Sequence, residues 1–245
     1  MKFTVESDVG LKRAVNEDRV HVSVREDGHM LALLADGMGG HNAGEIASDM
    51  AITLFEEQFL QVDTATLNEQ LSKQVWIEQT VKRINEEVYD YSLRHEQCTG
   101  MGTTLIAALI DGGHFTICHI GDSRVYTFTE QDAVQITRDH SYVNVLVDHG
   151  EISEEEAEHH PRRNVITKAV GTERHVEPTF YTFEALADTY ILVCSDGLSD
   201  KCSIAEIQAI LLLEKTLEEK GRMLVQLAND SGGEDNISLA LLYNG

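Results

Sequence analysis

Basic residues, proline and long hydrophobic runs are all scarce in this sequence. Only 19 lysines and arginines stand against 42 aspartates and glutamates, which gives a formal net charge of −23. A surface this acidic argues against nucleic acid or an anionic membrane as the main partner. No apolar run approaches the roughly 20 residues that a helix needs to cross a bilayer. We therefore expect a soluble protein with no direct membrane insertion.

Proline and cysteine are also informative by their low counts. Pro161 and Pro178 are the only prolines, and no Ser/Gly-rich or low-complexity linker interrupts the chain. We therefore expect a single domain over residues 1–245. The four cysteines form no CxxC pair, and the start MKFTVESDVG does not resemble a signal peptide. Both observations favour a reducing, cytoplasmic setting.

Segments of strand type are short, and several are joined by turns of only a few residues, which forces antiparallel neighbours. Helical periodicity occurs in blocks, near residues 46–54 and over residues 77–91, and capping-box sequences at Ser203 and Thr216 indicate two later helix starts. Helices thus cluster in the sequence rather than alternating with strands. This pattern predicts an α+β fold of antiparallel sheets with helices on the outer faces.

Four segments of strand type carry an aspartate at one end, beside glycine or another small residue. Asp36 follows the apolar run LALLA, Asp122 ends HFTICHIGD, Asp196 ends TYILVCSD, and Asp235 precedes ISLALLY. Each one alone is more often a turn or cap residue. If paired strands bring these ends together, however, the carboxylates repel one another unless hard divalent cations neutralise them. Oxygen ligands without zinc-type spacing favour Mg²⁺ or Mn²⁺, and Asp18 is a candidate fifth carboxylate.

Between residues 139 and 167 the periodic pattern weakens into a polar stretch that contains EISEEEAEHHPRRN. One interpretation is an ordinary solvated surface. The other is a flap over about residues 141–167 that carries Arg162 and Arg163 near a substrate entrance. Loops long enough to hold their own short helices are often functional.

Eight motifs follow one another along the chain: SDVGLKRAVNEDRV, LLADGMGGHNAGEIAS, MGTTL, HIGDSRVY, TRDHSYV, RNVITKAVG, CSDGLSD and GGEDNIS. In this order they resemble the motifs of bacterial metal-dependent protein serine/threonine phosphatases, the PPM or type 2C family. The resemblance runs from Ser7 to about Ser238. It implies a four-layer α-β-β-α sandwich, two antiparallel sheets flanked by helices, and hydrolysis of phosphoserine and phosphothreonine in proteins.

The same resemblance implies a role for each residue at a matching position. Asp36 would bridge two tightly bound Mn²⁺ or Mg²⁺ ions, and the Gly37 carbonyl would bind one of them. Asp196 and Asp235 would hold the other ion, while Asp18 would act mainly through metal-bound water.

Three further positions follow from the resemblance. Asp122 is similar to a residue that bacterial members use, with Asp196, for a third and weaker ion. Arg13 resembles the family's phosphate-binding arginine, whose guanidinium fork suits two phosphate oxygens at once. Met38 stands where many eukaryotic members have a histidine that is thought to protonate the leaving group, and methionine cannot donate that proton. His41 is then the nearest candidate for the general acid, with metal-bound water as its rival.

The chemistry implied is attack in line on phosphorus by a metal-bridging hydroxide, without a phosphoenzyme, because two cations lower the pKa of a bound water. The expected partners are phosphorylated proteins, including a cognate Ser/Thr kinase whose signalling the enzyme would reverse, and the chain is expected to be a monomer.

Two alternative functions are compatible with the same fold. One is a pseudophosphatase that only binds a partner, against which the intact Asp36, Asp196 and Asp235 argue. The other is a phosphatase dedicated to one phosphoprotein.

Overall fold

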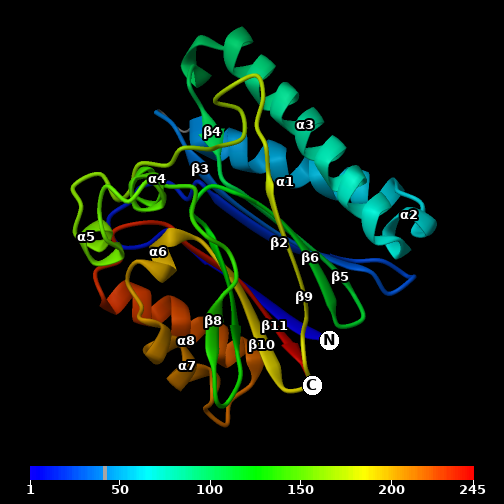
Figure 1. Ribbon diagram of the computed structural model, residues 1–245, viewed down its shortest axis with the longest axis vertical. Helices are drawn as coiled ribbons and strands as arrows, with labels where there is room; N and C mark the ends of the chain where they lie inside the picture. Colours follow the sequence, from blue (N-terminus) through cyan, green and yellow to red (C-terminus); the bar gives the residue numbers. More distant parts are fainter. Residues whose placement is uncertain (41–42) are drawn as a thin grey trace.

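Two antiparallel β-sheets lie face to face in the computed structural model, and helices cover both outer faces (Figure 1). The structure describes residues 1–40 and 43–245. The first sheet, called the β10 sheet below, has the order β1 (Lys2–Asp8), β11 (Ile237–Asn244), β10 (Thr189–Cys194), β7 (Arg124–Phe128) and β8 (Ala133–Gln135). The second, called the β3 sheet, has the order β2 (Asp18–Val24), β3 (Met30–Met38), β5 (Leu105–Asp111), β6 (His114–Ile120) and β9 (Thr179–Glu184), and β4 (Gly102–Thr103) pairs with the end of β3.

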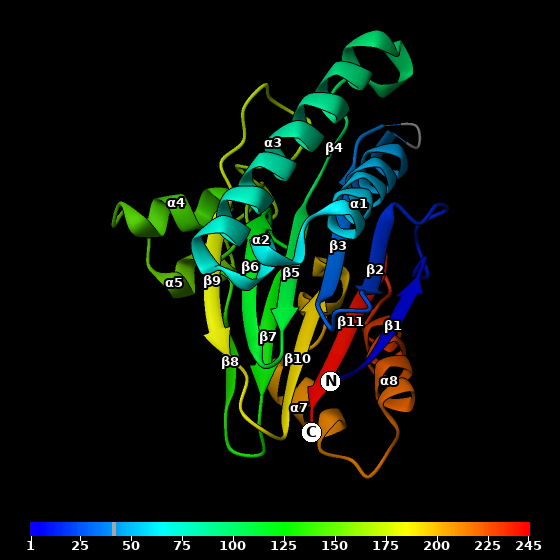
Figure 2. The ribbon, with the colours of Figure 1, turned by 90° about the vertical axis from the view of Figure 1, so that its right-hand side faces the viewer.

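The helices form the two outer layers. The β3 sheet is covered by α1 (Ala43–Gln61) and α3 (Gln70–Arg94), with α2 (Thr64–Asn68) between them in the chain and the 3₁₀ helix η1 (Glu96–Cys98) after them (Figure 2). The β10 sheet is covered by α7 (Ile204–Leu211) and α8 (Leu217–Asp230). Three short helices, α4 (Tyr142–Asp148), α5 (Glu154–Glu158) and α6 (Asp196–Ser199), lie in connections. The predicted α+β fold, a four-layer α-β-β-α sandwich, is confirmed. Within the described residues, no helix combines the length and the apolar character that a membrane crossing requires.

Strand β3 is buried on both faces, which explains its uninterrupted apolar sequence. Leu31, Leu33 and Ala35 face the layer of α1 and α3. Ala32 and Leu34 alternate with them and pack between the two sheets, against residues of β10 and β11. Successive side chains of a strand point to opposite faces, so a strand at the centre of a four-layer fold needs an apolar residue at every position. The strand is thereby fixed from both sides just before Asp36.

The sequence also predicts where the later helices begin. Ser203 and Thr216 each accept a hydrogen bond from the backbone N–H of a glutamate three residues later, and that glutamate accepts one in return from the cap residue. These capping boxes begin α7 and α8, as predicted. The predicted periodic block of residues 77–91 lies inside the longer α3.

The structure corrects the expectation that Asp36, Asp122 and Asp196 each end a strand. Asp36 lies inside β3, because β4 pairs with Gly37 and Met38 and prolongs the strand. Strand β10 ends at Cys194, and Asp196 is the first residue of α6. Asp122 lies in the turn between β6 and β7. Strands β1, β8 and β9 were not predicted from the sequence; they pair with β11, β7 and β6.

Candidate metal centre

Asp18 and Asp36 lie directly opposite each other in the register of β2 and β3. Opposed residues of an antiparallel pair share one face of the sheet, with Cβ atoms roughly 4.5–5.5 Å apart. The side chain of Asp18 also reaches the β10 sheet, where its Oδ2 accepts a hydrogen bond from Ser195 Oγ at 2.7 Å. Ser195 Oγ in turn accepts the backbone N–H of Ser238 at 3.0 Å. Asp18 therefore links the two sheets at the place where the acidic residues meet.

Asp196 and Asp235 are brought together by a close crossing of two backbones. Asp196 begins α6, and the next residue, Gly197, lies against the start of β11. A Cβ on Gly197 would lie 1.9 Å from the carbonyl oxygen of Asn236 and 3.4 Å from Cβ of Asp235. Only glycine permits this approach. The sequence CSDGLSD therefore needs its glycine for space, and that space puts Asp196 beside Asp235.

A second close crossing follows Asp36. A Cβ on Gly37 would lie 2.1 Å from the carbonyl oxygen of Gly44 and 2.6 Å from that of Glu17. In the reverse sense, a Cβ on Gly44 would lie 2.8 Å from the Gly37 carbonyl oxygen. The first turn of α1 thus packs directly on the strand at the site, and neither glycine can carry a side chain there.

The acidic side chains perturb one another strongly. Burial, reinforced by the charges of Asp18, Asp196, Asp122 and Asp235, raises the pKa of Asp36 well above its usual range. Burial is also the main cause that raises the pKa of Asp18 to about 7 and that of Asp196 to about 6, with neighbouring carboxylates adding to both. Carboxylates that are buried close together stay protonated to higher pH unless a cation binds near them.

Unpaired carboxylate oxygens show what the cluster can bind. Asp18 Oδ1 and Asp196 Oδ1 are buried and have no hydrogen-bond partner in the described part of the chain. A buried, unsatisfied carboxylate oxygen is costly, and a divalent cation satisfies it. No three acidic, histidine or cysteine side chains within residues 1–40 and 43–245 are arranged to hold one ion by themselves. Mg²⁺ commonly uses one or two carboxylates and retains water at its other positions, so the residues fit ions of this hard type.

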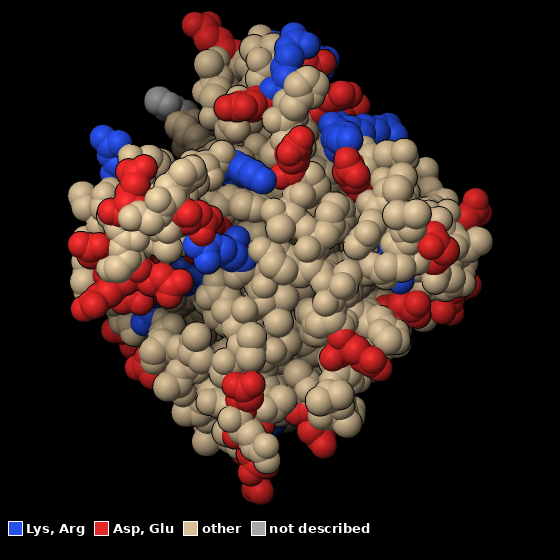
Figure 3. Space-filling model, viewed as in Figure 1, with Lys and Arg blue, Asp and Glu red and all other residues tan. Residues whose placement is uncertain are grey.

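Asp122 lies at the edge of the same cluster. Burial, followed by the charges of Asp196 and Asp139, raises its pKa to about 7. Asp122 and Asp196 together line a hollow of about 880 Å³, called the flap cleft below. Its other wall belongs to the segment of residues 141–167, which carries α4 and α5. Figure 3 shows acidic side chains gathered over α4 and α5, beside a broad uncharged surface over β8 and β9.

Arg13 forms an ion pair with Asp235, a candidate metal ligand. Its Nη2 lies 2.8 Å from Oδ2 of Asp235, and the two side chains are 48% and 35% exposed. The loop that carries Arg13 is held by Asn236, whose amide donates to the carbonyls of Val9 and Val15 at 3.0 and 2.9 Å. Arg13 therefore lies at the open side of the acidic cluster.

Two residues of the site were not singled out from the sequence. Asn236 is buried, and its Oδ1 also accepts the backbone N–H of Glu17 at 2.8 Å. Glu17 accepts hydrogen bonds from the backbone at Gly44 and Glu45, where α1 begins, and burial raises its pKa. In the sequence, Glu17 is marked only by its place next to Asp18 in NEDR, and Asn236 only by its place next to Asp235 in GGEDNIS.

Thr104 and Ser123 connect Asp36 with the turn of Asp122. Thr104 Oγ1 accepts the backbone N–H of Asp36 at 3.0 Å and lies 2.8 Å from Ser123 Oγ. Thr103 Oγ1 donates to the Asp36 carbonyl at 2.9 Å. These hydroxyls fix the backbone of the site rather than its chemistry.

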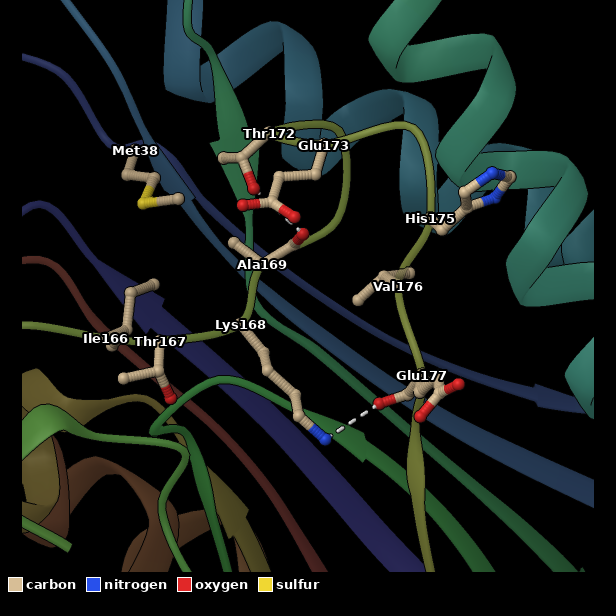
Figure 4. A pocket seen from close by; sticks show the side chains of 10 residues that line it. All are labelled: Met38, Ile166, Thr167, Lys168, Ala169, Thr172, Glu173, His175, Val176 and Glu177. Carbon is tan, nitrogen blue, oxygen red and sulfur yellow. Dashed lines mark hydrogen bonds between the residues drawn. The ribbon is translucent and has the colours of Figure 1, made fainter. Parts of the chain in front are cut away.

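The structure does not decide between His41 and metal-bound water as the general acid. His41 lies outside the described residues. Met38 lies beside a second hollow of about 410 Å³, across which Lys168 Nζ donates to the Glu177 carbonyl at 3.1 Å (Figure 4). The histidine of this hollow, His175, lies on the side away from Met38 in Figure 4. His175 therefore does not take the place of the histidine that many eukaryotic members have at the position of Met38.

Comparison with known proteins shows which family and which solved structures this chain resembles. Residues 12–236 match the family described as Protein phosphatase 2C. A serine/threonine phosphatase of Listeria monocytogenes is 37% identical over 236 residues, covering 96% of this chain and 93% of the relative. The solved serine/threonine phosphatase of S. agalactiae is 36% identical, with a TM-score of 0.94 and coverage of 100% of this chain and 99% of the other.

A further solved structure contains metal. The catalytic domain of the serine threonine protein phosphatase PstP, in complex with 2 manganese ions, is 36% identical and superposes with a TM-score of 0.82, covering 98% of this chain and 96% of the other. The coverage of both chains means that the similarity extends over the whole fold.

The raised pKa values predict how the metal-free protein responds to pH. Asp18 and Asp196 have folded-state pKa values of about 7 and about 6, above the roughly 4 of an unfolded chain. The folded state then binds more protons than the unfolded state, so this contribution to stability is complete below about pH 4 and is lost as the pH rises to about 7. The melting temperature in a chelator should therefore fall between pH 5.5 and 7.5, and Asp18→Asn should flatten the fall.

Saturating Mn²⁺ should reverse the loss at pH 7.5 by roughly 5–10 °C, since a ligand at 100 times its Kd adds about 2.7 kcal/mol. Differential scanning calorimetry measures both effects. Asp90→Asn, a change at an exposed carboxylate on α3, is the matched control and should behave as wild type. Equal slopes in wild type and Asp18→Asn would contradict the electrostatic description of the cluster.

Proposed function

Because this chain belongs to the protein phosphatase 2C family, we propose that its acidic cluster is the metal centre of the reaction. The protein is a metal-dependent protein serine/threonine phosphatase. The observation that carries the proposal is the meeting of Asp18, Asp36, Asp196 and Asp235 from four separate segments, where a buried oxygen of Asp18 and one of Asp196 have no hydrogen-bond partner among residues 1–40 and 43–245. Like charges at this density call for divalent cations.

Each acidic residue has a proposed place around two tightly bound ions, Mn²⁺ or Mg²⁺. Asp36, whose pKa is affected by all the other carboxylates, is the residue proposed to bridge them. The Gly37 carbonyl would hold one ion, Asp196 and Asp235 would hold the other, and Asp18 would act through water. Ions bound in this way supply positive charge for the phosphoryl oxygens and make a water molecule acidic near neutral pH.

Arg13 is proposed to bind the phosphoryl group of the substrate. Its ion pair with Asp235 is half exposed, and exposed pairs are worth only about 0–1 kcal/mol. The guanidinium can therefore leave Asp235 for phosphate at little cost, and its fork matches two oxygens. The same exchange would release an Asp235 oxygen for metal.

The leaving alkoxide needs a proton, and Met38 has none to give. His41 is the proposed donor, with water as the rival, because it is the nearest imidazole in the sequence after Asp36. The weaker third ion is proposed at Asp122 with Asp196, which line the flap cleft together.

The substrates are proposed to be phosphorylated proteins, including those made by a cognate Ser/Thr kinase in signalling. The segment of residues 141–167 forms one wall of the flap cleft, and we propose that this flap governs which proteins are accepted. A single domain over residues 1–245, a monomeric state and a cytoplasmic location complete the proposal. Phosphoproteomics of cells with and without the protein identifies the substrates.

Asp36→Asn should abolish hydrolysis of p-nitrophenyl phosphate and phosphopeptides, because it removes charge that both ions share. The loss should exceed about 100-fold, the upper range for residues that only support metal ligands. Steady-state assays over a Mn²⁺ titration measure it, with Asp90→Asn as control. Near-normal turnover at saturating Mn²⁺ would overturn the bridging role, and an inactive wild type would favour a protein that only binds its partners.

Arg13→Ala should weaken inhibition by inorganic phosphate by about one to two decades while both tight ions remain bound. A lost charge-assisted hydrogen bond is worth roughly 1.5–3 kcal/mol. Arg13→Lys should rescue only in part, because lysine lacks the planar fork. Arg83→Ala, at an exposed arginine of α3, is the control. Unchanged phosphate inhibition in Arg13→Ala would show that another group binds the phosphate.

Asp122→Ala should keep two tight ions by calorimetry and turn over phosphopeptides roughly 10–100-fold more slowly. A site at the edge, with few carboxylates, retains most of its water and fills only at higher metal concentration. Loss of all metal binding would place Asp122 in the main pair. Full activity at every metal concentration would remove the third ion from the reaction.

A further inference from the structure

His140 makes hydrogen bonds to three separate segments near the metal centre. Its Nδ1 accepts the backbone N–H of Gly121 at 3.1 Å, and its own backbone N–H donates to the Gly121 carbonyl at 2.8 Å. Its carbonyl accepts from both the backbone N–H and the Oγ1 of Thr167, at 2.7 and 3.0 Å. Its Nε2 lies 2.8 Å from Thr179 Oγ1, at the start of β9. Because Nδ1 accepts, Nε2 carries the proton and donates it to Thr179.

The first of these segments is the turn that presents Asp122. Gly121, immediately before Asp122, is held by His140 on both its N–H and its carbonyl. After Asp122, the Ser123 carbonyl accepts from Nε2 of the buried His119 at 2.9 Å. The His119 and His140 rings stack with their centroids 4.7 Å apart. The two imidazoles thus form one block that holds the turn on each side of Asp122.

The second segment is the base of the flap, where the chain enters and leaves residues 141–167. His140 immediately precedes the flap, and Thr167, bonded to its carbonyl, is the last residue of it. The next contacts inward, from the Tyr142 backbone N–H to the Val165 carbonyl at 2.7 Å and the bridge between Ser141 and Ile166, continue the closure. His140 therefore joins the two ends of the flap.

We infer that His140 is a positioning residue that locks the Asp122 turn to the base of the flap, so that the third-ion site and the substrate-facing wall of the flap cleft are held as one unit. This inference rests on the proposed function, in which Asp122 binds a weak third ion and the flap selects substrates. A substrate protein that moves the flap then also moves the turn of Asp122, and the occupancy of the third-ion site depends on how firmly the flap is seated.

The ring of His140 is already committed to this task. Both of its nitrogens have partners, which leaves neither free to bind a metal or to transfer a proton. Burial lowers the pKa of His140 to about 4 and that of His119 to about 3, so both rings are neutral at pH 7 and Nδ1 remains an acceptor. Lys168 is the charged group that adds to this lowering of both pKa values.

The test compares His140→Ala with His140→Asn, because the Asn side-chain oxygen can replace Nδ1 as an acceptor for the Gly121 N–H. In His140→Ala we expect the Gly121 amide to exchange its hydrogen at least about tenfold faster. We also expect the Mn²⁺ concentration for half-maximal phosphopeptide turnover to rise roughly 10–100-fold, the usual effect of losing a group that orients a metal ligand. The two tight ions should remain by calorimetry, and His140→Asn should recover part of both effects.

His114→Ala is the matched control, since His114 is an exposed histidine at the other end of β6, and it should match wild type in every measurement. A folded His140→Ala protein with wild-type Gly121 exchange and wild-type Mn²⁺ dependence would overturn the inference, as would loss of the two tight ions. If His140→Ala does not fold, the same two measurements on His140→Asn and Thr179→Val decide the question, since wild-type values in both would overturn it.

The outcome is separable from that of the proposed function. If Asp122→Ala leaves the Mn²⁺ dependence unchanged, the third ion fails as a proposal. Faster Gly121 exchange and faster proteolysis within residues 141–167 in His140→Ala would then still support the lock between turn and flap. Unchanged exchange and unchanged proteolysis would overturn that lock as well.

Discussion

Repulsion among carboxylates is the constraint on which this structure depends. Asp18, Asp36, Asp196 and Asp235 meet where the two sheets adjoin, and burial, reinforced by their mutual charge, raises the pKa values of the first three. Left alone, such a cluster favours protonation or separation. The fold prevents separation through features of the backbone, and divalent cations would remove the repulsion. Metal dependence in this family is therefore a consequence of geometry as much as of chemistry.

The backbone features that resist this repulsion are few and specific. Strand register sets Asp18 against Asp36. Gly197 lets Asp196 lie beside Asp235, and Gly37 lets α1 press on the strand that carries Asp36. Behind them, β3 is buried on both faces. The packed hydrophobic layers make the fold rigid. This rigidity holds the like charges of the candidate metal centre close together.

The open side of the cluster is built differently from its base. Arg13 reaches it through a half-exposed ion pair with Asp235, and the flap forms a wall of the cleft beyond Asp122. His140 couples that wall to the Asp122 turn. The groups proposed to meet the substrate thus lie on loops, and the groups proposed to hold metal lie on or beside the sheets. This division is common where a rigid scaffold carries adaptable loops.

Local patterns in the sequence are enough to predict the fold class, the helix starts at Ser203 and Thr216, and the acidic residues of the candidate site, because apolar periodicity, capping boxes and aspartates beside glycine need no distant partner to be recognised. The folded chain is needed to show that Asp196 begins a helix, that Asn236 holds the Arg13 loop, and that Arg13 pairs with Asp235. The contacts of Asn236 and Asp235 with the Arg13 loop join segments more than two hundred residues apart in the chain. A local pattern carries no information about such a partner, since the energy of the contact exists only once the two sheets have packed.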